Sequence, residues 1–202
     1  MLRNPFVRTL LLTGWLWGAP MSAFGSAPDV VAADRWEIDV ETGVLWSVGG
    51  KASPLDYVIL PQFVTLRGPA HFRRPWAGGE LVLRPRFSLL LQPIVRGPEH
   101  HHLGASAAGV FEWWNQRADR AFFLSSGGGL GGMDSRGYDV EGGQGQDLNF
   151  NWFIFAGARR HWAANRHLSL GLYYQHLSNT GLDGINPGID ALGPVLSFSW
   201  GF

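Results

Sequence analysis

The chain has 202 residues, a length that suits one domain, and its formal net charge at pH 7 is zero. Charged residues make up only 16% of it, while the chain holds 28 glycines and 10 tryptophans. This composition argues against a helical bundle and against disorder, and the zero net charge disfavours nucleic-acid binding. The sequence contains no cysteine, which excludes disulfides, thiolate chemistry and cysteine-based zinc sites.

Residues 1–27 are predicted to be a secretory signal peptide. A basic start precedes an apolar stretch at residues 10–19, and small residues follow at Ala23, Gly25 and Ala27. We expect cleavage between residues 23 and 33, which leaves a barrel domain at residues 34–202 outside the cytoplasm. No later run reaches the ~18 apolar residues that a transmembrane helix needs.

The remaining chain alternates apolar and polar residues with the period of two that is typical of β-strands. Eight strands are predicted, at residues 36–48, 56–67, 80–91, 103–115, 120–131, 147–161, 168–178 and 195–202. Short turns at 116–119 and 163–166 alternate with long, glycine-rich loops at 133–146 and 179–190, and only the link at 68–78 departs from this pattern. The pattern indicates an all-β fold, an eight-stranded antiparallel transmembrane β-barrel of the outer membrane.

A soluble lipocalin-like barrel also closes with eight strands, so the two faces of the strands must be assigned. One face carries bulky residues, namely Trp36, Trp46, Trp200 and Phe202. The opposite face carries charges, namely Glu37, Asp39, Glu41, Arg84, Arg86 and Glu112. Bulky residues facing lipid and paired charges filling a narrow lumen favour the membrane barrel. The terminal strand, which ends on Phe202, also resembles the insertion signal of outer-membrane barrels.

The most informative segment for chemistry covers residues 174–190. His176 and Ser178 lie two residues apart on a predicted strand, so both point to one face. A serine beside an imidazole can act as a nucleophile with the histidine as its base, and a carboxylate must orient the histidine. Asp190 and Asp183 are the nearby carboxylates, and Asp190 is well placed if the last two strands pair. The alternation puts the pair on the lipid face at the outer-leaflet level, where lipopolysaccharide is the main lipid.

The run His176-Leu-Ser178-Asn179, with Asn186-Pro187-Gly188 downstream, resembles the lipid A 3-O-deacylase (PagL) family of outer-membrane acyl hydrolases. The resemblance implies a triad of Ser178, His176 and an acid, with Asp190 at the position where the family has glutamate. The oxyanion or substrate-positioning residues that it implies are Asn179, Gly181 and Asn186. It also implies hydrolysis of an ester-linked acyl chain of lipid A without a cofactor.

The expected partners are lipid A and outer-membrane lipid, with a second copy of the chain as a further candidate and no nucleic acid. The alternative function is a non-catalytic barrel with a structural or surface-binding role.

Two other motifs in the sequence are less informative about function. Consecutive histidines at His100–His102 would alternate faces of a strand, which disfavours a shared metal ion. The glycine run at 127–132 lacks the lysine of a phosphate loop, and close packing of strands explains it better.

Overall fold

The computed structural model describes residues 33–49 and 55–202, and most of these residues lie in antiparallel β-strands. The strands are β1 Glu37–Gly43, β2 Leu45–Ser47, β3 Val58–Ile59, β4 Gln62–Arg67, β5 Phe72–Trp76, β6 Gly79–Arg96, β7 His101–Asn115, β8 Arg120–Met133, β9 Leu148–Ala163, β10 Arg166–Ser178 and β11 Ile189–Gly201. The predicted signal peptide at residues 1–27 lies outside the described residues. Within the described residues no helix is long and apolar enough to cross a membrane.

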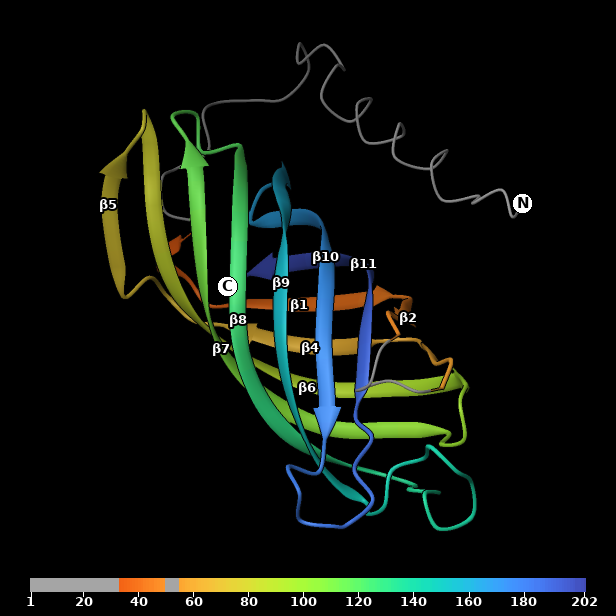
Figure 1. Cartoon of the computed structure of the whole chain (residues 1–202). Coiled ribbons are helices and arrows are strands. Elements are labelled where there is room, and N and C mark those ends of the chain that lie inside the picture. Colours follow the sequence, from red (N-terminus) through yellow and green to blue (C-terminus); the bar gives the residue numbers. More distant parts are fainter. Residues whose placement is uncertain (1–32, 50–54) are drawn as a thin grey trace, which may run out of the picture.

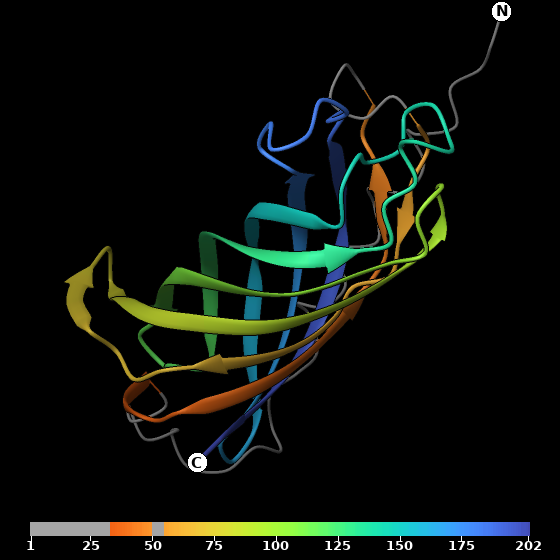
Figure 2. The same ribbon diagram turned by 90° about the horizontal axis from the view of Figure 1, so that it is seen from below.

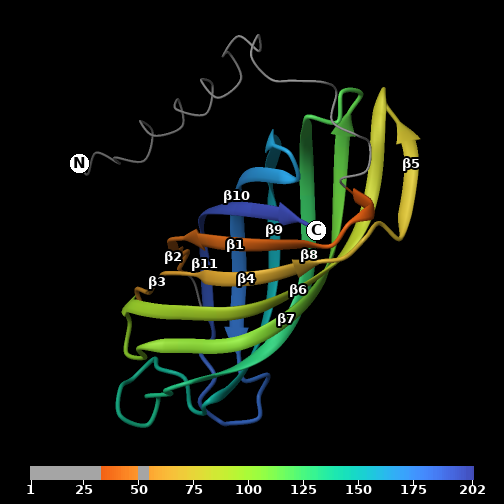
Figure 3. The same cartoon turned by 180° about the vertical axis from the view of Figure 1, so that it is seen from behind.

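The sheet closes on itself because β1 pairs with β4 on one side and with the last strand, β11, on the other. Val40 of β1 therefore faces both Val64 and Phe198. The short strands β2 and β3 continue β1 and β4, so the ring has the eight strands that were predicted. Strands of one wall cross those of the opposite wall steeply (Figures 1 and 3), as the tilt of a closed barrel requires.

The outer surface is apolar and the interior is charged, as the alternation predicted. The bulky residues Trp36, Trp46, Trp200 and Phe202 point outward and are 41% to 68% exposed. Leucines, valines and phenylalanines of the other strands join them, among them Val64, Phe87, Leu89, Leu124 and Leu172. An apolar outer wall of this kind is suited to contact with lipid rather than with water.

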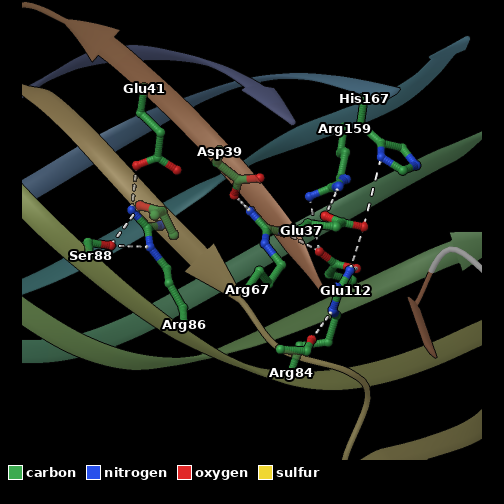
Figure 4. A network of polar contacts seen from close by, with 12 residues as sticks. Glu37, Asp39, Glu41, Arg67, Arg84, Arg86, Ser88, Glu112, Arg159 and His167 are labelled. Atoms are coloured by element: carbon green, nitrogen blue, oxygen red, sulfur yellow. Dashed lines mark hydrogen bonds and ion pairs between the residues drawn. The ribbon is translucent and has the colours of Figure 1, made fainter. Parts of the chain in front are cut away.

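Buried ion pairs occupy the lumen (Figure 4). Arg67 bridges Asp39 and Glu112, with its contact to Asp39 at 2.6 Å. The other pairs are Arg84 with Glu37, Arg86 with Glu41, and Arg159 with Glu37. These side chains are almost fully buried, and a buried charge is tolerated when an opposite charge and hydrogen bonds accompany it. The alternation in the sequence predicted the acids and two of these arginines on the lumen face, but not Arg67 and Arg159.

The glycine run of β8 permits close approach of the neighbouring strand, as expected. A Cβ atom at Gly127 would lie 2.1 Å from the carbonyl oxygen of Ala107, and one at Gly129 would lie 1.9 Å from that of Ala105. These distances are too short for any side chain, so glycine is required where β7 and β8 coil tightly together.

Two elements differ from the prediction. The last strand begins at Ile189 rather than at residue 195, because Gly193 and Pro194 conceal its alternation. Pro194 lies beside the break between β1 and β2, where its carbonyl oxygen still accepts from the Val44 N–H. The link at 68–78 forms β5, a hairpin with β6 (Figure 2). Its two turn residues, Ala77 and Gly78, both have positive φ, which a tight hairpin turn requires.

Candidate active site

The predicted site residues lie where β10 ends and β11 begins, at the end of the barrel that carries the loops 134–147 and 179–188 (Figure 1). His176 and Ser178 share the outward face of β10 with Leu170 and Leu172, so both side chains point toward the lipid side of the wall. The strand register places Asp190 of β11 directly opposite His176. Because opposite residues in antiparallel strands have Cβ atoms ~5 Å apart, a short aspartate suffices to reach the imidazole.

The imidazole of His176 and the carboxylate of Asp190 form a direct contact. The Nδ1 atom of His176 lies 2.8 Å from Oδ1 of Asp190. The two side chains are 24% and 15% exposed, so the contact is largely shielded from water. This arrangement leaves the other ring nitrogen, Nε2, to accept a proton, which is the geometry of a histidine that serves as a general base.

Ser178 lies beyond His176 on the same face, opposite Phe150 of β9. Within residues 33–49 and 55–202 its hydroxyl has no hydrogen-bond partner, so it remains available to a substrate. Hydrogen bonds between a nucleophile and its base are often long before substrate binds. The structure thus brings together His176 and Asp190, and presents Ser178 next to them.

Tyr174 is a further residue of the site, which the sequence pattern alone did not distinguish. Its hydroxyl donates a hydrogen bond of 2.6 Å to Oδ1 of Asp190, the oxygen that also contacts His176. The Trp152 ring, opposite His176 on β9, packs against Tyr174 with ring centroids 5.1 Å apart. The spacing of Tyr174 and His176 on one strand face was visible in the sequence, but an outward tyrosine is equally typical of a membrane interface.

Asp183, the other carboxylate considered for the triad, makes different contacts. Its Oδ2 accepts a hydrogen bond of 2.8 Å from the Tyr138 hydroxyl, and its Oδ1 accepts one of 2.7 Å from the Ile185 N–H. The Gly145 N–H also donates to the Ile185 carbonyl oxygen. Asp183 therefore connects the loop 179–188 to the loop 134–147 instead of reaching the imidazole.

The three residues considered for an oxyanion hole have distinct positions in the loop. The Asn179 side chain is buried, where its Oδ1 accepts from the Gly181 N–H and its Nδ2 donates to Ile185. Thr180 and Gly181 have φ of 56° and 81°, so this hydrogen bond supports a left-handed turn. Oδ1 of Asn186 accepts from the Asn179 N–H at 3.0 Å, which leaves the Nδ2 group of Asn186 as a donor.

The three consecutive histidines do not simply alternate, because His100 and His101 share one partner and only His102 points elsewhere. His100 and His101 contact Asp134 through their Nδ1 atoms, at 2.5 Å and 3.4 Å. His102 turns into the lumen and contacts Gln92 at 3.0 Å. His101 and His102 belong to β7, which begins two residues before the predicted start at residue 103. Among the described residues no group of three or more His, Cys, Asp or Glu side chains is arranged to hold a metal ion.

The wall beside the site is apolar. On the neighbouring outward positions of β9, β10 and β11, Ile154, Leu172 and Leu192 are exposed. Leu192 lies opposite Tyr174, one outward position along β11 from Asp190. A nucleophile, a base and an acid above such a wall can transfer an acyl group whose hydrocarbon chain stays in the membrane.

Comparisons with known proteins identify a family and a similar fold. The family model described as lipid A 3-O-deacylase (PagL) matches residues 66–199, which is more than half of the chain and includes all of β10. Among solved structures, the crystal structure of the outer membrane enzyme PagL is similar with a TM-score of 0.56 and 20% sequence identity. That similarity covers 80% of this chain and 97% of that chain, and it shows the barrel fold. No curated protein sequence matches the chain.

Proposed function

Since the chain belongs to the lipid A 3-O-deacylase (PagL) family, we propose that it removes an ester-linked acyl chain from lipid A in the outer leaflet. The observation that carries the proposal is the contact between His176 and Asp190 on the lipid-facing side of the barrel. His176 lies two residues before Ser178 on the same face of β10. Serine esterases use a serine, a histidine and a carboxylate, and the contact between the histidine and the carboxylate is the one formed here.

In the proposed reaction Ser178 Oγ attacks the ester carbonyl carbon while its proton moves to Nε2 of His176. Asp190 stabilises the imidazolium that forms and keeps the ring oriented. The tetrahedral intermediate then collapses, the sugar hydroxyl leaves with the proton from His176, and the acyl group remains on Ser178. Water attacks this acyl-enzyme by the same proton transfer and releases the fatty acid.

The carbonyl oxygen becomes negatively charged in the tetrahedral intermediate and needs a hydrogen-bond donor. We assign this role to Nδ2 of Asn186, because the Asn179 N–H fixes the other end of the same amide. Asn179 and Gly181 hold the turn that positions Asn186, since their own donors are engaged within the loop. A donor held in place before reaction stabilises the intermediate without reorganisation.

The substrate reaches the site laterally from the membrane. The three catalytic side chains face outward on a wall that also presents Leu172 and Leu192, so the acyl chain can lie against the barrel. The polar part of lipid A then sits at the level of the loops 134–147 and 179–188.

The experiment that tests this function is mass spectrometry of lipid A from cells that carry the gene for this protein and from cells that lack it. We expect lipid A from the carrying cells to lose the mass of one fatty acyl chain. Unchanged lipid A, despite correctly folded protein in the outer membrane, would favour the non-catalytic barrel instead.

A further inference from the structure

Two tryptophans flank the proposed catalytic residues on the outer wall. The strands β9, β10 and β11 lie side by side, and β2 continues the ring beyond β11 (Figure 1). Trp152 of β9 is the direct register partner of His176, whereas Trp46 of β2 is the partner of Leu192. The two indoles are similarly exposed, at 45% and 48%. They form two different walls, and an acyl chain bound beside His176 can lie against one or the other.

The orientation of the imidazole favours the Trp152 side. Nδ1 of His176 contacts Asp190 on β11, so Nε2 lies on the part of the ring that points away from β11. The ester carbonyl must lie about 3 Å from Ser178 Oγ and close to Nε2 when the ester reacts. On the β9 side, Phe150 is opposite Ser178 and Trp152 is opposite His176. The carbonyl group and the acyl carbons attached to it therefore lie next to β9.

The Trp152 indole is held in place from the β10 side. Its ring centroid lies 5.1 Å from that of Tyr174 and 6.2 Å from that of His176. Tyr174 is in turn fixed by its hydrogen bond to Asp190. On β8 the register partner of Trp152 is Gly128, which has no side chain to pack against the indole. Trp152 therefore presents a fixed, flat apolar surface beside the reacting atoms.

Shape rather than apolarity must select between acyl chains at such a surface. An acyl chain in the bilayer is already surrounded by hydrocarbon, so contact with an apolar side chain gains little free energy by itself. A rigid side chain beside the reacting ester, however, admits only groups that fit into the remaining space. A flat indole leaves room for a straight chain of methylene groups but not for a branch on the carbon next to the carbonyl.

We propose that Trp152 is a specificity-determining residue, which restricts the site to acyl chains that are unbranched next to the ester carbonyl. The inference rests on the proposed function and adds to it which acyl chains are accepted. The carbons next to the carbonyl pack against the indole, and the remainder of the chain continues along the apolar wall that includes Leu172. Trp46 is separated from β10 by β11, so it does not bound these carbons.

Ester hydrolysis by the purified, detergent-folded protein tests the proposal. The substrates are p-nitrophenyl octanoate and p-nitrophenyl α-methyloctanoate, and the measured quantity is the ratio of their kcat/KM values. The wild type should prefer the straight ester at least about tenfold, since one methyl group in a tight pocket changes the rate by about 10- to 200-fold. Trp152→Ala should reduce this preference about tenfold by hydrolysing the branched ester faster, and Trp152→Phe should be intermediate. The matched control is Trp46→Ala, which removes the same side chain from the other flank and should keep the wild-type ratio.

This readout separates selection by shape from mere support of the imidazole, because poor folding cannot increase activity on the branched ester. If Trp152 only supported His176, Trp152→Ala would slow both esters by the same factor. That result would overturn the proposal, and so would an equal change of the ratio in Trp46→Ala.

Photocrosslinking tests the position of the acyl chain without hydrolysis. Ser178→Ala is incubated with a glucosamine ester whose acyl chain carries a diazirine close to the carbonyl. Crosslinks should map to the β9 segment that contains Trp152, and crosslinks to the β2 segment that contains Trp46 would contradict the proposal. Wild-type protein that hydrolyses the octanoate ester but leaves lipid A intact would refute only the lipid A substrate. Deacylated lipid A together with an unchanged ester ratio in Trp152→Ala would refute only the role of Trp152.

Discussion

The Tyr174 hydroxyl donates a 2.6 Å hydrogen bond to Asp190 through the same carboxylate oxygen that contacts His176. This second donor restricts the rotation of a carboxylate that is one methylene shorter than the glutamate of the family resemblance. We therefore propose Tyr174 as a positioning residue, since its hydroxyl contacts Asp190 and Asp190 contacts the imidazole.

Tyr174→Phe should lower kcat about tenfold and leave KM nearly unchanged, because a hydrogen bond to a charged group contributes about 1.5 kcal/mol. Steady-state kinetics of fatty-acid release from purified lipopolysaccharide measures both constants. The matched control is Tyr138→Phe, which removes the hydroxyl that contacts Asp183. Equal effects of the two substitutions on kcat would contradict a positioning role for Tyr174.

The two aspartates should differ sharply on substitution. Asp190→Asn should reduce turnover by about 10²- to 10⁴-fold, because an amide at this position favours the wrong imidazole tautomer. Asp190→Glu should retain activity, since it keeps the carboxylate. Asp183→Asn should reduce turnover less than about tenfold, because its contacts lie between two loops. A damaging Asp183→Asn beside a benign Asp190→Asn would reassign the acid.

Much of this site was predictable because β-strand geometry is regular. A period of two fixed the common face of His176 and Ser178, and the pairing of neighbouring strands brought Asp190 opposite His176. The start of the last strand was harder to predict. Gly193 and Pro194 interrupt the alternation, so residues 189–194 show no strand pattern in the sequence.

Side-chain contacts between distant segments could not be predicted from the sequence pattern. Tyr174 could have faced lipid alone, and its bond to Asp190 depends on the register of two strands. In the lumen, Arg67 and Arg159 come from strands far apart in the chain, so no local spacing links them to Glu112 and Glu37. Loop contacts such as that of Asn179 with Asn186 depend on turn geometry in the same way.

Asn186 should contribute to catalysis rather than to stability. Asn186→Ala should reduce kcat about 10²- to 10³-fold, the usual effect of removing one oxyanion donor. Asn179→Ala removes the hydrogen bonds that shape the turn, so it should alter both kcat and KM. Kinetics on the folded fraction of each variant separates the two roles. An Asn186→Ala enzyme with a normal kcat would remove Asn186 from the oxyanion hole.

The lumen arginine Arg67 should be important for stability. Arg67→Met leaves Asp39 and Glu112 buried without this partner and should lower the free energy of unfolding by about 3–5 kcal/mol. Arg96→Met, at an exposed ion pair with Asp56, should change it by less than about 0.5 kcal/mol. Urea unfolding in detergent measures both. Activity per folded molecule should stay unchanged in Arg67→Met, because the residue lies away from β10 and β11.

The most direct test of the account is the mass of lipid A after incubation with the purified, folded wild type and with Ser178→Ala. The wild type should release one fatty acyl chain, and Ser178→Ala should be slower by about 10³- to 10⁶-fold. His176→Ala should behave alike, and the double variant should be little worse than either single one. Heat-modifiable gel migration confirms that each variant is folded. Normal release of the fatty acid by folded Ser178→Ala would contradict the assignment of Ser178 as the nucleophile.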